Sequence, residues 1–218
     1  MLDHKGFDRW ADGYDRSVGL SDAARSYPFA GYGKVLDRIF QTVTERENAV
    51  VLDVGFGTGV LAARLYENGC TVYGQDFSEG MIAMARERMP GATLVRGDLS
   101  SGLSPVLRQI SYDFIVSTYA LHHLDDPGKI TLIRALLERL KPGGRLLIGD
   151  VAFRTRTDLD RCRKAAGDEW DEDEFYFVRD EMMPAFPLMG YEQISFCAGL
   201  ITLPGGGCPT PDTGRTGA

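Results

Sequence analysis

The stretch VLDVGFGTGVLAARL, residues 51–65, decides the fold. Apart from Asp53 its first residues are apolar, which is typical of a strand in a parallel sheet that is covered on both faces. Gly55, Gly57 and Gly59 follow at every second position, and a helical pattern comes after them. Glycine permits a sharp turn from strand to helix and lets a ligand approach the backbone. The stretch therefore predicts a strand–turn–helix unit. Its turn either binds a ligand or is a tight turn without a ligand.

The spacing of these glycines separates two kinds of ligand. A dinucleotide-binding turn reads GxGxxG, which requires a third glycine at position 60, and this chain has Val60 there. The departure weakens a nicotinamide or flavin interpretation. Because a helix N-terminus also attracts a carboxylate, a nucleoside that carries a carboxylate is the better prediction.

The residues around this stretch repeat the same alternation of strands and helices. Apolar, β-branched runs predict strands at 49–55, 71–76, 93–98, 112–118 and 144–152, and amphipathic patterns predict helices at 59–69, 78–91 and 127–140. This order is typical of an α/β fold of the Rossmann-like, doubly wound class with a mostly parallel sheet. Residues 7–45 predict two helices, residues 157–190 a helical segment, and residues 191–204 a terminal β-hairpin. Within the helical segment, the acidic run from Asp168 to Glu174 is interpreted as a solvated face.

Composition narrows the class of partner. The chain has 218 residues and a net charge of −7, which disfavours a nucleic-acid surface because phosphate binding needs excess lysine and arginine. No run reaches the roughly 18 apolar residues of a membrane span, and the N-terminus has no apolar leader segment. The four cysteines show no metal-binding spacing. We expect a cytoplasmic protein, a monomer or homodimer, that binds small molecules and neither nucleic acid nor membrane.

Two more predicted strands end in carboxylates. Asp76 lies 21 residues after Gly55, and an acid at this spacing accepts hydrogen bonds from ribose hydroxyls. The alternative without a ligand is that Asp76 only places a negative charge at a helix N-terminus. Asp98 ends the next strand and can accept from an adenine amino group. Since the carboxyl ends of parallel strands meet at one crevice, these acids and the glycines predict one adenosine-binding site.

The motifs VLDVGFGTG, YGQDFS, RGDL and LKPGGRLLIGD, in this order, resemble those of the class I S-adenosylmethionine-dependent methyltransferases, over roughly residues 35–200. FDRWADGYD and YDFIVSTYALHHL resemble the YrrT-like branch of bacterial small-molecule methyltransferases. The resemblance implies a seven-stranded sheet with helices on both faces and an antiparallel last strand. S-adenosylmethionine is then expected across the carboxyl ends of the strands, beneath a helical N-terminal lid.

The resemblance also implies which residues bind each part of the cofactor. Those expected around its methionine part are Asp53, Gly55, Gly57 and Gly59. Asp76 is expected at the ribose, and the residues expected at the adenine are Asp98, Leu99, Phe77 and Met81. Ser117 and Tyr119 are expected near the sulfonium and methionyl end, and Tyr14 and Tyr32 are lid candidates for the cofactor carboxylate.

Two adjacent histidines, His122 and His123, follow the fourth predicted strand in ALHHLDD. Acceptors that lose a proton on methylation need a base, and histidine titrates near neutral pH, so both are candidate catalytic bases. The structural alternative is that one of them caps the next helix or bonds to Asp125 or Asp126. A metal site built from these four neighbours is not expected, because adjacent residues seldom converge on one ion.

These observations predict one domain over residues 1–204: a helical lid (1–45), a cofactor-binding core (46–152) and an acceptor side with a terminal hairpin (153–204), followed by a flexible tail (205–218). The predicted function is transfer of a methyl group from S-adenosylmethionine to a small-molecule acceptor, an enzyme of the EC 2.1.1 type. The alternatives are an S-adenosylmethionine-binding regulator without turnover and an NAD(P)-dependent oxidoreductase. The sequence does not identify the acceptor, because a shared fold carries no substrate information.

Overall fold

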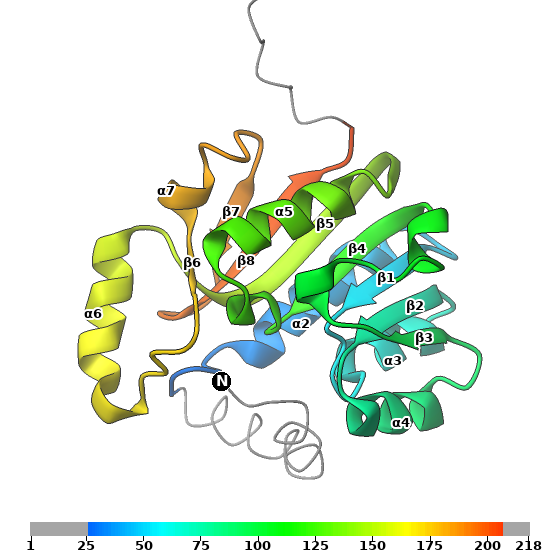
Figure 1. The fold of residues 1–218 in the computed structure, drawn as a ribbon, viewed down its shortest axis with the longest axis horizontal. Coiled ribbons are helices and arrows are strands. Elements are labelled where there is room, and N and C mark those ends of the chain that lie inside the picture. The colour runs from blue at the N-terminus through cyan, green and yellow to red at the C-terminus, as the bar shows by residue number, and fades with distance from the viewer. Residues whose placement is uncertain (1–25, 207–218) are drawn as a thin grey trace, which may run out of the picture.

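The computed structural model describes residues 26–206, in which strands and helices alternate along most of the chain (Figure 1). The strands, in chain order, are β1 (Val50–Val54), β2 (Thr71–Asp76), β3 (Thr93–Arg96), β4 (Tyr112–Thr118), β5 (Leu140–Phe153), β6 (Phe177–Val178), β7 (Gly190–Gln193) and β8 (Ala198–Pro204). The α-helices are α2 (Tyr32–Thr44), α3 (Val60–Glu67), α4 (Glu79–Arg88), α5 (Asp126–Leu137), α6 (Arg156–Ala166) and α7 (Arg179–Met182). Short 3₁₀ turns are η1 (Leu99–Ser101), η2 (Leu107–Gln109), η3 (Leu121–His123) and η4 (Gly167–Glu169).

The sheet has the order β3-β2-β1-β4-β5-β8-β7. Strands β1 to β5 are parallel to one another, whereas β8 is antiparallel to its two neighbours, β5 and β7. The two-residue strand β6 pairs with the end of β5 outside this path. The predicted doubly wound, mostly parallel sheet with an antiparallel last strand is therefore confirmed, and the predicted hairpin corresponds to β7 and β8.

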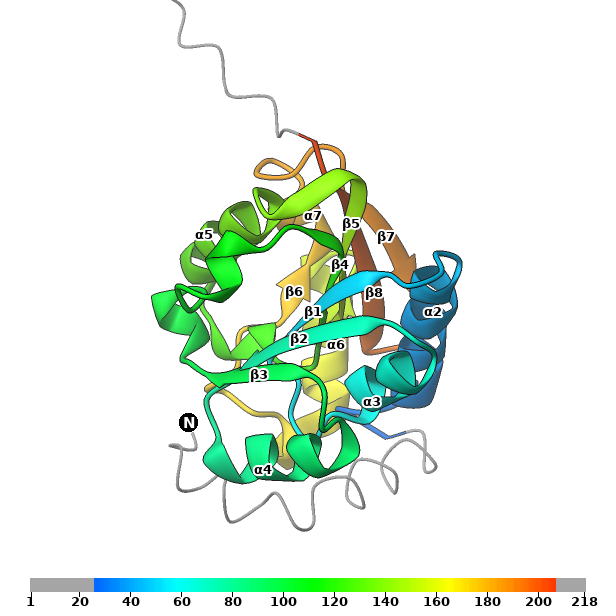
Figure 2. The same ribbon diagram turned by 90° about the vertical axis from the view of Figure 1, so that its right-hand side faces the viewer.

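Helices cover both faces of the sheet (Figure 2). The buried residues of α2, α3 and α4 form one apolar cluster with one face, and those of α5 and α7 form a second cluster with the other. β1 contributes Val51 to the first cluster and Leu52 to the second. Because side chains alternate along a strand, its unbroken apolar run is the consequence of being covered twice.

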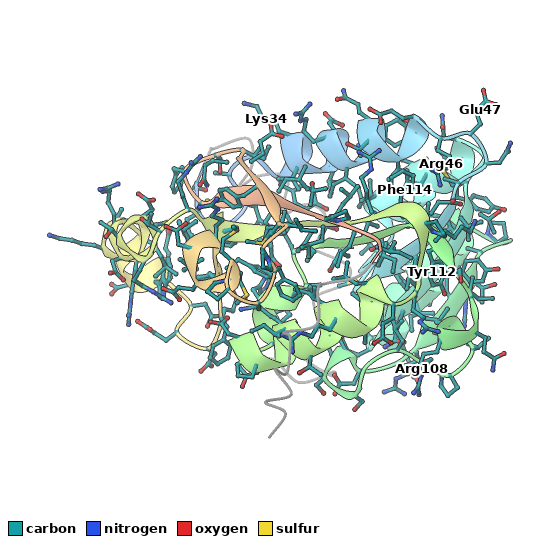
Figure 3. All side chains as sticks on the ribbon, turned by 90° about the horizontal axis from the view of Figure 1, so that it is seen from above. Lys34, Arg46, Glu47, Arg108, Tyr112 and Phe114 are labelled. Atoms are coloured by element: carbon teal, nitrogen blue, oxygen red, sulfur yellow. The ribbon has the colours of Figure 1, made fainter. Side chains whose placement is uncertain are left out.

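The beginning of β4 departs from regular pairing. A register shift between Tyr112 and Phe114 interrupts the ladder with β5, because Tyr112 pairs with Leu140 and Phe114 pairs with Arg145. Tyr112 packs in the cluster of α5, whereas Phe114 packs in the cluster of α2 beside Arg46 (Figure 3). Asp113 accepts hydrogen bonds from Arg46 Nη1 (2.5 Å) and from the Val50 N–H (2.8 Å). These bonds tie the start of β4 to the start of β1.

The prediction of a helical segment over residues 157–190 is wrong for most of its length. Helix α6 ends at Ala166, and β6 and the four-residue α7 follow. Pro184 and Pro187 cannot donate a backbone hydrogen bond, which disfavours a continuous helix after α7. The apolar run that contains Phe177 and Val178 is buried against the end of β5 instead.

Two of the sequence-based expectations concern residues outside the described range. These are the first of the two N-terminal helices, which carries Tyr14, and the tail from residue 207. Within residues 26–206, none of the helices has both the length and the apolar character that a membrane span requires.

Candidate functional site

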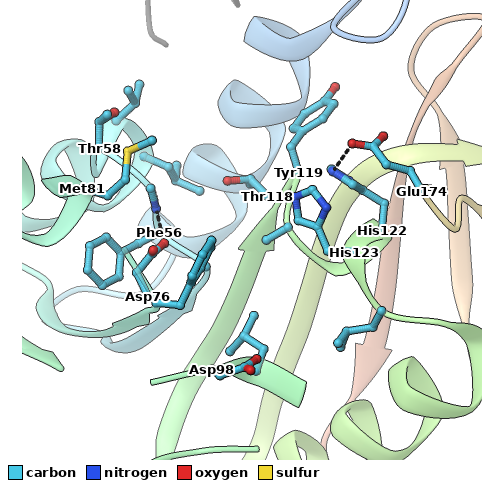
Figure 4. A pocket seen from close by; sticks show the side chains of 18 of the residues that line it. Phe56, Thr58, Asp76, Met81, Asp98, Thr118, Tyr119, His122, His123 and Glu174 are labelled. Atoms are coloured by element: carbon cyan, nitrogen blue, oxygen red, sulfur yellow. Dashed lines mark hydrogen bonds and ion pairs between the residues drawn. The ribbon is translucent and has the colours of Figure 1, made fainter. Parts of the chain in front are cut away.

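A cavity of about 570 Å³ opens at the carboxyl ends of the central strands (Figure 4). Its volume lies in the range of small-molecule sites, and its position is the usual ligand crevice of open α/β sheets. It is lined by Phe29, Tyr32, Gly55, Phe56, Gly57, Thr58, Val60, Leu61, Asp76, Phe77, Met81, Asp98, Leu99, Ser100, Thr118, Tyr119, Ala120, His122, His123, Leu124, Asp171, Asp173 and Glu174. Residues from both halves of the sheet thus meet in one space.

The glycine loop between β1 and α3 forms the floor at one end. Gly55, Gly57 and Gly59 all have positive φ angles, of 73°, 57° and 80°, which side chains with a Cβ rarely adopt. A Cβ on Gly55 would lie 2.4 Å from Ala120 Cβ, whereas a Cβ on Gly57 would meet no atom of residues 26–206 within 4 Å. The loop is therefore packed tightly at Gly55 and has open space at Gly57.

Asp76 holds this loop from the end of β2. Its Oδ2 accepts a hydrogen bond from the Gly57 N–H (2.8 Å), and its Oδ1 accepts one from the Ser78 N–H (3.0 Å). Each carboxylate oxygen has a second lone-pair site, so Asp76 can accept further bonds from a molecule in the cavity. The loop and the acid predicted to bind ribose are thereby joined directly.

Asp53 lies near the end of β1 and is 1% exposed. Among the described residues, its Oδ1 has no hydrogen-bond partner. Burial raises the pKa of Asp53 to about 8, and the negative charge of Asp76 adds to the effect. A buried acid without a partner is costly, and a nearby positive charge would favour its ionised form.

An apolar slot flanked by one carboxylate lies beside the loop. Phe77, Met81 and Leu99 line it, and Asp98 lies at its edge. Asp98 also caps η1, because its side chain accepts from the Ser100 N–H (2.8 Å). Such a slot suits a flat aromatic ring that carries a hydrogen-bond donor.

The opposite end of the cavity carries a buried histidine between two carboxylates. His122 Nδ1 lies 2.6 Å from Asp150 Oδ1, and its Nε2 lies 3.5 Å from Glu174 Oε1. Burial alone lowers the pKa of His122, but the charges of Asp150 and Glu174 outweigh burial and raise it above its usual value. Figure 4 shows this group across the cavity from Asp76.

His123 lies beside His122, and the ring centroids are 4.2 Å apart. Burial lowers the pKa of His123 to about 3, and the neighbouring His122 contributes to the shift. Glu174 Oε2 accepts from the hydroxyl of Tyr176 (2.6 Å), which is also hydrogen-bonded to Tyr27. This end of the cavity is a connected polar network.

Most residues predicted for the site do line the cavity. They are Gly55, Gly57, Asp76, Phe77, Met81, Asp98, Leu99, Tyr119, Tyr32, His122 and His123. Asp53 and Gly59 are not among the lining residues; a Cβ on Gly59, at the end of the loop, would lie 3.0 Å from Met89 at the α4 C-cap. Tyr14 is outside the described residues.

Ser117, expected near the sulfonium and methionyl end of the cofactor, is not among the residues that line the cavity. It is fully buried within β4, and its hydroxyl donates to the Val54 carbonyl (2.8 Å). Thr118 and Tyr119, the next residues, come at the end of the strand and reach the cavity. Ser117 lies one residue before the end of β4, where the neighbouring strands cover it, whereas Thr118 and Tyr119 lie at the open end of the sheet.

The partners expected for the histidines are corrected for His122. Asp125 caps α5 by accepting from the Gly128 N–H, and Asp126 binds Lys129 Nζ at 2.9 Å. The partners of His122 are Asp150 and Glu174, which are distant in sequence.

Sequence reasoning missed the role of the acidic run before β6. Asp171 and Asp173 are exposed, as the interpretation of a solvated face predicts, and together with Glu174 they also line the cavity. One signal was present, because the apolar residues 175–178 directly after it predict a buried strand. The missed aromatic residues Phe29 and Phe56 have no comparable signal.

Comparisons with known proteins agree with this geometry. A methyltransferase domain family model matches residues 51–144. An uncharacterised methyltransferase of Geobacillus kaustophilus is 35% identical over 193 residues, covering 85% of this chain and 86% of that protein.

Among solved structures, the complex of DhpI with SAH superposes with a TM-score of 0.68 at 18% identity, covering 93% of this chain and 95% of that one. Magnesium protoporphyrin IX methyltransferase from Synechocystis, with bound SAH, gives a TM-score of 0.63 at 18% identity, covering 81% of this chain and 84% of that one. At this identity the two likenesses show the fold.

Proposed function

The chain belongs to the class I S-adenosylmethionine-dependent methyltransferase family, and from that premise we propose that it transfers a methyl group from S-adenosylmethionine to a small-molecule acceptor. The observation that carries the choice of cofactor is Asp53, a buried acid behind the glycine loop with no described partner for Oδ1. S-adenosylmethionine carries a sulfonium and an amino group, whose positive charges favour an ionised carboxylate. A dinucleotide would bring a pyrophosphate toward the same acid, and like charges repel.

The cofactor is proposed to bind in the arrangement expected from the sequence. The open space at Gly57 accommodates its methionine part above Asp53. Asp76 accepts from the ribose hydroxyls, and the slot formed by Phe77, Met81 and Leu99 holds the adenine. When bound, the cofactor supplies an electrophilic methyl group on sulfur.

The protein's own contribution is to align the acceptor with that methyl group and to exclude water, which is worth about 7–11 kcal/mol where alignment is good. Tyr119, His122 and Glu174 line the end of the cavity away from the glycine loop, and we propose that the acceptor binds there. The size of the cavity supports a small acceptor. The YrrT-like branch and the base role of His122 or His123 stay predictions.

Calorimetric titration with S-adenosylmethionine, S-adenosylhomocysteine and NADH tests this proposal. Replacing Asp76 by Asn is expected to raise the Kd for both sulfur compounds about 10- to 100-fold, because hydrogen bonds to charged groups contribute about 1.5–3 kcal/mol. Glu67→Gln, an exposed carboxylate on α3, is the matched control and is expected to leave the Kd unchanged. Thermal unfolding checks that both variants remain folded.

The absence of S-adenosylmethionine binding at millimolar concentration, or tight binding of NADH alone, would overturn the proposal. A methyl-donor assay against thiols, amines, phenols and carboxylates then identifies the acceptor class. Binding without turnover on the whole panel would favour the regulator instead.

A further inference from the structure

We propose that His122, His123 and Glu174 bind one divalent transition-metal ion at the acceptor end of the cavity. One ligand atom from each of these residues lies within 4.8 Å of the other two. All three side chains line the same cavity, and two come from η3 while the third comes from the segment before β6 (Figure 4). The fold therefore brings together a donor set that the sequence keeps about 50 residues apart.

The separation of two of these atoms already fits an ion between them. His122 Nε2 and Glu174 Oε1 are 3.5 Å apart. Two ligand atoms that each lie about 2.1 Å from a tetrahedral ion are about 3.4 Å apart.

A second observation, independent of the three ligands, is the support behind His122. Nδ1 of His122 lies 2.6 Å from Asp150, whose Oδ1 also accepts from the Val151 N–H (2.8 Å). Metal-binding histidines almost always donate the other ring N–H to a carboxylate, carbonyl or water, which directs the free nitrogen toward the ion. Glu174 is held in the same way, since its Oε2 accepts from Tyr176.

Charge also favours a cation at this place. Asp150 is 1% exposed, and its Oδ2 has no hydrogen-bond partner among the described residues. Lys129 is the buried cation nearby, but its ammonium group binds Asp126 and the Phe175 carbonyl. A divalent ion would balance the two carboxylates that flank His122.

The donor set indicates the class of metal. Two imidazoles and one carboxylate suit Zn²⁺, Fe²⁺, Mn²⁺ or Co²⁺ better than Ca²⁺ or Mg²⁺, which prefer oxygen ligands. Three protein ligands leave further positions open toward the cavity, as in catalytic metal sites. An ion there would bind an oxygen, nitrogen or sulfur atom of the acceptor; this role rests on the proposed function, whereas binding of the ion does not.

The test uses the full chain after chelation, titrated with Co²⁺ as an optical probe and with Zn²⁺ in a calorimeter. We expect one ion per chain, with Glu174→Gln and His123→Ala each weakening binding at least about tenfold, and Asp150→Asn weakening it about 10- to 100-fold. Asp171→Asn, which removes another carboxylate from the cavity wall, is the matched control and is expected to bind Co²⁺ normally.

S-adenosylhomocysteine affinity is measured on every variant, so that loss of the metal site and loss of the cofactor site are distinguishable. No Co²⁺ or Zn²⁺ binding, or binding that survives both Glu174→Gln and His123→Ala, would overturn the metal site while leaving the proposed function intact. Full turnover in the presence of a chelator would overturn the role of the ion and favour a histidine base.

Discussion

At the scale of single residues, the three acids near the carboxyl ends of β1, β2 and β3 have different surroundings. Asp76 accepts two backbone hydrogen bonds, and Asp98 caps a 3₁₀ turn. Burial and the nearby charge of Asp76 raise the pKa of Asp53 to about 8. Its protonation therefore changes near neutral pH, and any ligand with a positive charge nearby is coupled to that change.

The affinity for S-adenosylmethionine is expected to rise with pH. Below about pH 8 the ligand-free protein holds Asp53 protonated, and a bound cation favours the ionised form, so binding releases a proton. The Kd then falls by up to about tenfold per pH unit as pH rises toward 8, and this contribution levels off above it. Calorimetry at several pH values, in buffers of different ionisation enthalpy, measures both the affinity and the released proton.

Asp53→Asn is the control for that measurement, because the amino group of the ligand itself titrates at about 7.7–8.0. The variant is expected to bind more weakly and to keep only the ligand's own pH dependence. Identical pH profiles for the two proteins would contradict the coupling to Asp53.

At the scale of elements, the three glycines of the turn between β1 and α3 have different surroundings. Gly55 packs against Ala120 at the end of β4, and Gly59 begins α3 against α4. Within the described part of the chain no atom lies within 4 Å of the place of a Gly57 Cβ, and Gly57 lines the cavity and donates to Asp76. Packing therefore favours glycine at positions 55 and 59, whereas at position 57 the positive φ favours it and, on the proposed function, so does the cofactor.

Alanine at Gly55 and at Gly57 is expected to have separable effects. Gly55→Ala places its Cβ against Ala120 and is expected to lower the free energy of unfolding by about 2–4 kcal/mol, from overpacking and a positive φ. Gly57→Ala is expected to lower it by only about 1–2 kcal/mol but to weaken cofactor binding strongly. Urea unfolding and calorimetry measure the two quantities, and normal cofactor affinity in Gly57→Ala would contradict the proposed position of the methionine part.

At the scale of the whole molecule, α2 packs directly on the middle of the sheet. Gly149 in β5 permits this contact, because a Cβ there would lie 2.1 Å from Val35 Cγ1 and 3.3 Å from Ile39 Cδ1. Tyr27, just before α2, stacks on Trp170 with ring centroids 5.2 Å apart. The N-terminal part of the described chain therefore packs both on the sheet and on Trp170, next to the acidic residues that line the cavity.

A double-mutant cycle tests the packing of α2. Gly149→Ala is expected to lower the free energy of unfolding by about 1–3 kcal/mol through overpacking, and Val35→Ala by about 2 kcal/mol through the cavity that it leaves. The new methyl group fills the space of the removed ones, so the double variant is expected to lose at least about 1 kcal/mol less than the sum. Strict additivity would show that α2 adjusts its position instead.

The sequence by itself determined the order of the elements, the class of the sheet and the acids at its strand ends. Apolar periodicity and glycine position are local properties, and they encode strands, helices and the turn at Gly55 to Gly59 without knowledge of distant residues. The positions of Asp76 and Asp98 at one site were also predictable, since parallel strands bring their carboxyl ends together.

Only the tertiary structure decided which side chains meet. Asp150 and Glu174 reach His122 from β5 and from the segment before β6, and no spacing in the chain predicts that meeting. Ser117 turned into the sheet while Thr118 reached the cavity, because side-chain direction depends on strand register and on where the strand ends. Local patterns determine backbone conformation, whereas contacts between distant residues depend on packing of the whole chain.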